Sequence, residues 1–132
     1  VLFNPVLDIT DLERRTNLFG GPEVARLLSP TQQVRPGAPP ALVMHGRDDD
    51  VVPAEQALRF KEAMVRAGNQ CRVRLYDGQG HGFFNFFDGD NPLFVETLGE
   101  TDRFLASLGY IAGPERVDTF VYKPEGIERV WV

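Results

Sequence analysis

"PPALVMHGRDDDVVPAEQALRFKEAMVRAG" (residues 39–68) reads in order as a buried strand, a polar loop and an amphipathic helix. Residues 41–46 ("ALVMHG") form a short apolar run that ends in glycine, which is typical of a strand covered on both faces. Apolar side chains then recur at spacings of three and four over residues 54–67, which predicts a helix with one buried face. Those side chains are Ala57, Phe60, Met64 and Ala67.

The segments around this stretch continue the same alternation. Residues 1–7 ("VLFNPVL") and 71–77 ("CRVRLYD") predict two more strands. Helices are predicted from Thr10 or Asp11 to Gly20, over residues 22–28 with a proline at the first position, and from Asn91 to Gly109. Strands that alternate with helices predict an α/β fold with a parallel sheet.

Length and composition exclude several classes of protein. A chain of 132 residues is enough for one domain, and its net charge of −5, without a Lys/Arg cluster, argues against nucleic acid or a polybasic membrane contact. No apolar run approaches the ~20 residues of a spanning helix, and no signal peptide opens the chain. The single cysteine, Cys71, excludes an internal disulfide, which favours a reducing, cytoplasmic location, although a secreted protein can also lack disulfides. Because the chain begins inside an apolar run without methionine, we expect a fragment or a processed chain.

Two loops at neighbouring strand ends carry the candidate chemistry. "HGRDDD" (45–50) and "GQGHG" (78–82) each follow a predicted strand, and the carboxyl ends of parallel strands share one edge of the sheet. We therefore expect the acidic loop and His81 to be neighbours. A carboxylate that accepts the Nδ1 proton of a histidine orients the ring and leaves Nε2 free as a base. Gly80 and Gly82 are expected to give the loop turns that other residues do not adopt.

The two motifs together resemble a known family. "HGRDDDVVP" before a helix, followed by "VRLYDGQGHGFFN", is similar to the C-terminal part of α/β-hydrolase-fold serine esterases of the acetyl esterase and prolyl-oligopeptidase-like group. In that group an aspartate stands three residues after the His-Gly glycine, and Gly-His-Gly-Phe follows the next strand. The resemblance implies that Asp49 and His81 are the acid and base of a Ser-His-Asp triad. It covers roughly residues 1–112 and implies no metal or cofactor.

The nucleophile of that family has no counterpart in this chain. Family members place serine in a Gly-x-Ser-x-Gly elbow upstream of the acid and the histidine. Ser29 precedes a proline in a connector, Ser107 lies in a helix stripe, and Cys71 is better interpreted as a small buried thiol. We therefore expect His81 to serve a serine outside this chain, and the chain alone to be inactive or weakly active.

Several residues allow a second interpretation. Asp48 or Asp50 replaces Asp49 if the loop is shifted, and the three aspartates otherwise form a solvated turn. The spacing of a calcium loop is not met. His45 is expected to pack at the strand end, and Arg47 either meets a carboxylated substrate or lies on the surface. Four phenylalanines either line an acyl pocket or pack as core: Phe83, Phe84, Phe86 and Phe87.

The tail departs from the alternating pattern. Residues 113–132 contain two strand-like runs around a turn, and they either begin a second hydrolase copy or form an extra edge strand or hairpin. A partial sheet leaves an edge unpaired, so we expect a homo-oligomer or a complementary chain. The implied activity is hydrolysis of a small carboxylic ester. The alternatives are a non-catalytic binding or assembly module and a prolyl-oligopeptidase-like peptidase.

Overall fold

The computed structural model describes residues 1–11, 19–87 and 91–115. Contacts within the chain divide it into two compact units, Val1–Phe86 and Phe87–Val132. No helix among the described residues is long and apolar enough to cross a membrane.

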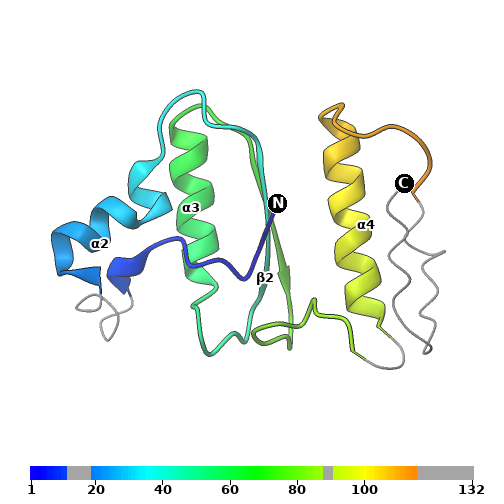
Figure 1. Cartoon of the computed structure of the whole chain (residues 1–132), viewed down its shortest axis with the longest axis horizontal. Coiled ribbons are helices and arrows are strands. Elements are labelled where there is room, and N and C mark those ends of the chain that lie inside the picture. Colours follow the sequence, from blue (N-terminus) through cyan, green and yellow to red (C-terminus); the bar gives the residue numbers. More distant parts are fainter. Residues whose placement is uncertain (12–18, 88–90, 116–132) are drawn as a thin grey trace. The chain divides into compact units, whose positions relative to one another are not determined.

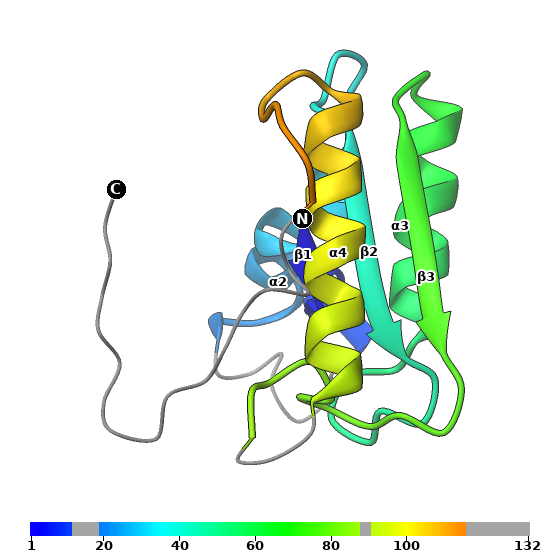
Figure 2. The same ribbon diagram turned by 90° about the vertical axis from the view of Figure 1, so that its right-hand side faces the viewer.

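The first unit, which includes β2 and α3 in Figure 1, is built on a parallel three-stranded sheet in the order β1-β2-β3. The order of the strands can be followed in Figure 2. Val43 of the central strand is paired with Leu2 on one side and with Val73 on the other. The predicted parallel α/β arrangement is therefore confirmed. The strands are β1 (Leu2–Phe3), β2 (Ala41–Gly46) and β3 (Cys71–Tyr76).

The core forms where helix α3 (Glu55–Arg66) packs on this sheet. The predicted face of α3 is buried, because Ala57, Phe60 and Met64 join Val43 of β2 in one apolar cluster. All of β2 after its first residue is buried, as expected for a strand between two others. The cluster fixes α3 on the sheet, and the loops at the carboxyl ends of β2 and β3 lie outside this cluster.

The N-terminal strand is shorter than the predicted residues 1–7. Pairing with β2 ends at Phe3, because Asn4 has a left-handed φ of 39° and Pro5 has no N–H to donate. The apolar pattern still reflects burial, since Leu7 is only 2% exposed. Its backbone N–H is donated to the Gln56 side chain of α3 instead of to a strand.

The connection from β1 to β2 contains short helical segments. Of the helix predicted to begin at Thr10 or Asp11, the structure describes a 3₁₀ turn, η1 (Ile9–Asp11), and residues 12–18 lie outside the described part. Helix α2 (Pro22–Leu28) matches the prediction, with proline at its first position. The connector expected to be irregular contains one further 3₁₀ turn, η3 (Pro30–Gln33).

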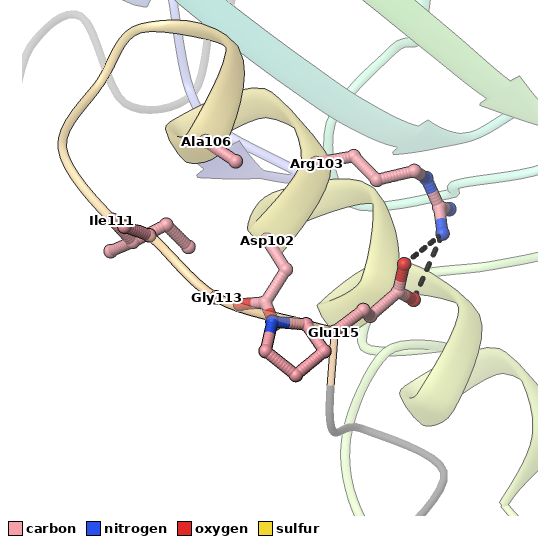
Figure 3. A pocket seen from close by; sticks show the side chains of 8 residues that line it. Asp102, Arg103, Ala106, Ile111, Gly113 and Glu115 are labelled. Carbon is pink, nitrogen blue, oxygen red and sulfur yellow. Dashed lines mark hydrogen bonds and ion pairs between the residues drawn. The ribbon is translucent and has the colours of Figure 1, made fainter.

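The second unit contains helix α4 (Pro92–Ser107), which confirms the predicted helix after the histidine loop. An ion pair between Arg103 and Glu115, with Nη1 and Oε2 2.8 Å apart, holds the segment after α4 against the helix (Figure 3). The same segment and helix border a pocket of about 550 Å³ that Asp102 and Ile111 line. The hairpin predicted within residues 113–132 lies outside the described residues from position 116 onward.

Candidate active site

The loops that follow β2 and β3 lie against each other, as predicted. The Asp48 N–H donates to the Gln79 carbonyl at 3.0 Å. Gly46 permits this approach, because a Cβ at that position would lie 2.7 Å from the Gly80 carbonyl oxygen, closer than real Cβ contacts. Close packing therefore requires glycine at the end of β2, and the absence of a side chain there lets the acidic loop contact the histidine loop.

Asp49 is the aspartate of this loop that points inward. Its side chain is fully buried, and Oδ1 accepts the Val51 and Val52 N–H groups, each at 2.9 Å. The other oxygen, Oδ2, lies 2.8 Å from Nδ1 of His81. Asp48 and Asp50 are exposed, so the loop has the register that was expected for Asp49.

These contacts set the charge state of the carboxyl. Burial raises the pKa of Asp49, but the hydrogen bonds from Val52, His81 and Val51, together with the charge of His81, outweigh it and hold the pKa below its ordinary value. Asp49 is therefore a carboxylate at neutral pH. A buried carboxylate with three donors around it is a fixed acceptor for the imidazole proton.

His81 is accessible where Asp49 is not. Its side chain is 42% exposed, against 0% for Asp49. Because Oδ2 of a carboxylate accepts, Nδ1 of His81 carries a proton, and in the neutral ring Nε2 then holds a lone pair. Within the described ranges no residue is hydrogen-bonded to Nε2. This geometry leaves the outer nitrogen available to a reacting group.

The glycines around His81 differ from the prediction in one respect. Gly82 has a φ of +82°, which favours glycine, whereas Gly80 is not in the left-handed region. A Cβ on Gly80 would meet only the Asp48 carbonyl oxygen at 3.8 Å, an ordinary contact. Of the two glycines that flank the histidine, only Gly82, which follows it, has a backbone conformation that favours glycine.

Aromatic packing fixes the chain after His81. The Phe83 ring lies 4.7 Å from that of Tyr76 and 5.6 Å from Phe84, and Phe84 lies 4.8 Å from Phe3. These contacts run from the end of β3 to β1. Phe83 and Phe84 are therefore half-buried against other aromatic rings, while Phe87 is 61% exposed.

Asn4 also contacts the segments that carry Asp49 and His81, and the sequence pattern did not predict this. It is 4% exposed, and its side chain contacts the end of β2 and the loop after β3. Its Oδ1 accepts the Gly46 N–H at 2.9 Å, and its Nδ2 donates to the Gly80 carbonyl at 3.2 Å. The available signal was an asparagine followed by Pro5 at the end of a strand, which is typical of a chain reversal. That signal predicts a turn and not a tertiary contact.

His45 takes the structural role expected of it, and Arg47 lies on the surface. His45 is fully buried, and its Nδ1 lies 2.9 Å from the Gly46 carbonyl oxygen and 3.9 Å from Oδ2 of Asp49. Its Nε2 is buried without a hydrogen-bond partner in the part of the chain that is described. Arg47 forms an exposed ion pair with Asp77. Among the described residues no group of three or more His, Cys, Asp or Glu is placed to hold a metal ion.

The candidate nucleophiles of the chain are engaged elsewhere. Ser29 is buried, with its hydroxyl bonded to the Ala25 carbonyl and to the Ile9 N–H. Ser107 donates to the Phe104 carbonyl within α4. Cys71 begins β3 while His81 follows its end, and a strand of six residues spans about 17 Å. Cys71 is partly buried, and burial raises the pKa of its thiol despite the opposing charge of Lys61.

Comparison with known proteins places the chain in a family. Residues 12–87 match the model of the prolyl oligopeptidase family. The chain belongs to the prolyl oligopeptidase family. Esterase LipC of Mycobacterium tuberculosis is 47% identical over 70 residues, which are 52% of this chain and 17% of LipC. The non-reducing polyketide synthase pkbA of Emericella nidulans is 37% identical over 73 residues, 52% of this chain and 3% of the synthase.

Solved structures show where this family member fits in a larger fold. Esterase 2 of Thermogutta terrifontis with propionate bound superposes with a TM-score of 0.75 at 38% identity, covering 86% of this chain and 44% of that chain. The same esterase phosphonylated by sarin gives a TM-score of 0.76 at 36% identity, covering 86% and 45%. The chain therefore has an α/β-hydrolase arrangement, and it spans less than half the length of these esterases.

Proposed function

We propose that this chain supplies the acid and the base of a serine carboxylic ester hydrolase, with Asp49 orienting His81. The observation that carries the proposal is the 2.8 Å contact between a fully buried carboxylate and a partly exposed imidazole at neighbouring strand ends. The esterase resemblance of the sequence and of the fold supports the reaction class. Residues 1–112 then correspond to the C-terminal portion of a hydrolase domain.

The chemistry follows from the two nitrogens of His81. Nε2 takes the proton of a serine hydroxyl as its oxygen attacks the ester carbonyl, and Asp49 stabilises the imidazolium that forms. The imidazolium then gives this proton to the departing alkoxide, so the alcohol leaves and the acyl group stays bound to the serine oxygen as an acyl-enzyme. A water molecule then reacts in the same way. His81 takes a proton from the water, the hydroxide attacks the acyl group, and the serine oxygen leaves with the proton that His81 returns to it. The lowered pKa of Asp49 keeps it ionised throughout.

The serine and the oxyanion hole come from outside the described residues in this proposal, because Ser29 and Cys71 are placed away from His81. The side of β1 that does not face β2 is the expected point of attachment. Within the described part of the chain β1 pairs with β2 alone, and an open parallel edge accepts another strand. We expect a complementary segment or a second copy of the chain to pair there.

The proposal is tested by joining residues 1–112 to the remaining portion of Thermogutta terrifontis esterase 2, in place of its matching part. That esterase contains a group that sarin phosphonylates. A fluorophosphonate probe should label the chimaera once, as measured by intact mass, and His81→Ala should abolish both labelling and hydrolysis of an aryl acetate. A folded chimaera that is neither labelled nor active would favour a non-catalytic module and contradict the proposal.

A peptidase activity is the second candidate, favoured by membership of the prolyl oligopeptidase family. Both activities use the same Asp49–His81 pair, so the substrate distinguishes them. Comparing an aryl acetate with a proline amide on the same chimaera gives two values of kcat/KM. We expect the acetate to be preferred, and a preference for the amide would replace the esterase assignment.

Association through the β1 edge has its own test. Light scattering on the chain by itself should give a mass above that of one copy, or calorimetry should show a poorly folded chain that the complementary segment stabilises. A chain that is both monomeric and cooperatively folded would contradict the proposed pairing.

A further inference from the structure

We propose that Asn4 is a positioning residue that holds the His81 loop in register with Asp49; this inference rests on the function proposed above. Asn4 lies at the end of β1, away from the acid and the base in the sequence. Through His81 it would affect the reaction without touching the substrate.

The contacts of Asn4 join all three strand ends. Its backbone N–H donates to the Met44 carbonyl of β2 at 2.9 Å. Its side-chain oxygen accepts the Gly46 N–H at 2.9 Å, and its side-chain nitrogen donates to the Gly80 carbonyl at 3.2 Å. Gly46 lies three residues before Asp49, and Gly80 directly precedes His81. One buried amide therefore sets the spacing between the two loops.

The chemistry of the position favours asparagine. The side chain has to accept from one loop and donate to the other, and an amide does both from two separate atoms. The backbone also has a φ of 39°, a region that asparagine, aspartate and glycine tolerate better than other residues. Aspartate has no donor for the Gly80 carbonyl, and glycine has neither group.

The loop needs such a contact because its own backbone is permissive. Gly78 and Gly82 both have left-handed φ values, so the segment that carries His81 has freedom that other residues lack. Phe3, the last residue of β1, and Asn4, which follows it, restrain this segment on both sides of the histidine. Asn4 binds the carbonyl just before His81, and Phe3 packs on Phe84 just after it.

The test uses the full chain labelled with ¹⁵N. It measures the NMR chemical shifts of the ring nitrogens of the two histidines at alkaline pH, where imidazole is neutral. Asn4→Asp keeps the acceptor for Gly46 and loses the donor for Gly80. Asn4→Gly keeps the left-handed backbone, loses both side-chain contacts and adds no charge. Asn69→Asp is the matched control, since Asn69 also accepts an amide N–H, from Gly37 at 3.0 Å, and donates to a carbonyl, of Arg35 at 2.8 Å.

We expect His81 to be a single Nδ1–H tautomer in the parent chain and in Asn69→Asp, and a mixture of tautomers in both Asn4 variants with the amide spectrum of the sheet retained. A single tautomer retained in the folded Asn4 variants would overturn the inference. So would loss of the fold in both variants, because Asn4 would then support the whole sheet. If Asp49→Asn leaves the tautomer of His81 unchanged, the proposed pairing of Asp49 with His81 is itself wrong.

Discussion

His81 donates its Nδ1 proton to Oδ2 of Asp49 over 2.8 Å, although 32 residues separate them in the sequence. The two partners differ in exposure: the carboxylate is buried and fixed by backbone N–H groups, while the ring is partly exposed. A fixed acceptor behind an accessible ring is the arrangement that directs one imidazole nitrogen outward. The contact depends on two loops that touch only because their strands are neighbours in a parallel sheet.

The close approach of these loops makes Gly46 sensitive to a single methyl group. In Gly46→Ala the new Cβ would overlap the backbone carbonyls of Gln79 and Gly80, which cannot rotate away. We expect a loss of about 1–3 kcal/mol in the free energy of unfolding, measured in urea. Gly80→Ala is the control, since its Cβ finds an ordinary contact; equal losses in the two variants would contradict the explanation.

The aromatic contacts predict different results for two neighbouring phenylalanines. Phe84 packs between Phe3 and Phe83, whereas Phe87 is mostly exposed. Phe84→Ala should lower the free energy of unfolding by about 2 kcal/mol, less than a fully buried phenylalanine because Phe84 is half-buried. Phe87→Ala should change it by less than about 0.5 kcal/mol. The opposite order in thermal or urea denaturation would show that Phe84 does not anchor the loop.

Asp8 predicts how stability depends on pH. Burial raises its pKa, but hydrogen bonds from Thr10, Gln32 and Ser29 outweigh it, so the pKa of Asp8 is lower in the folded chain than its ordinary value. A carboxyl group whose pKa is lower in the folded chain than in the unfolded chain stabilises the fold. Its contribution is complete above the pKa of the unfolded chain, about 4, and is lost as the pH falls through the pKa of the folded chain.

Asp8→Asn should therefore be less stable than the parent at neutral pH, by about 1–3 kcal/mol for a buried, hydrogen-bonded group. The difference should shrink progressively below about pH 4. Urea denaturation of both proteins across this range measures it. A difference that grows toward acid would contradict the assigned sign.

Periodicity predicted the elements that pack and missed the residues that act through backbone conformation. The stripe of α3 and the apolar run of β2 are local patterns, and both were found with nearly correct ends. The meeting of Asp49 and His81 was predictable because it follows from parallel topology and loop position. The early end of β1 and the role of Asn4 were not, because they depend on a left-handed φ and on partners more than 40 residues away.

The effect of Asp49 on turnover tests the central claim most directly. In the chimaera with esterase 2, Asp49→Asn should lower kcat for an aryl acetate by a factor on the order of 10⁴, because the amide favours the wrong tautomer of His81. Asp50→Asn, an exposed neighbour, should leave kcat within about twofold of the parent. If Asp49→Asn and Asp50→Asn turn over equally fast, Asp49 does not orient the catalytic base and the assignment is wrong.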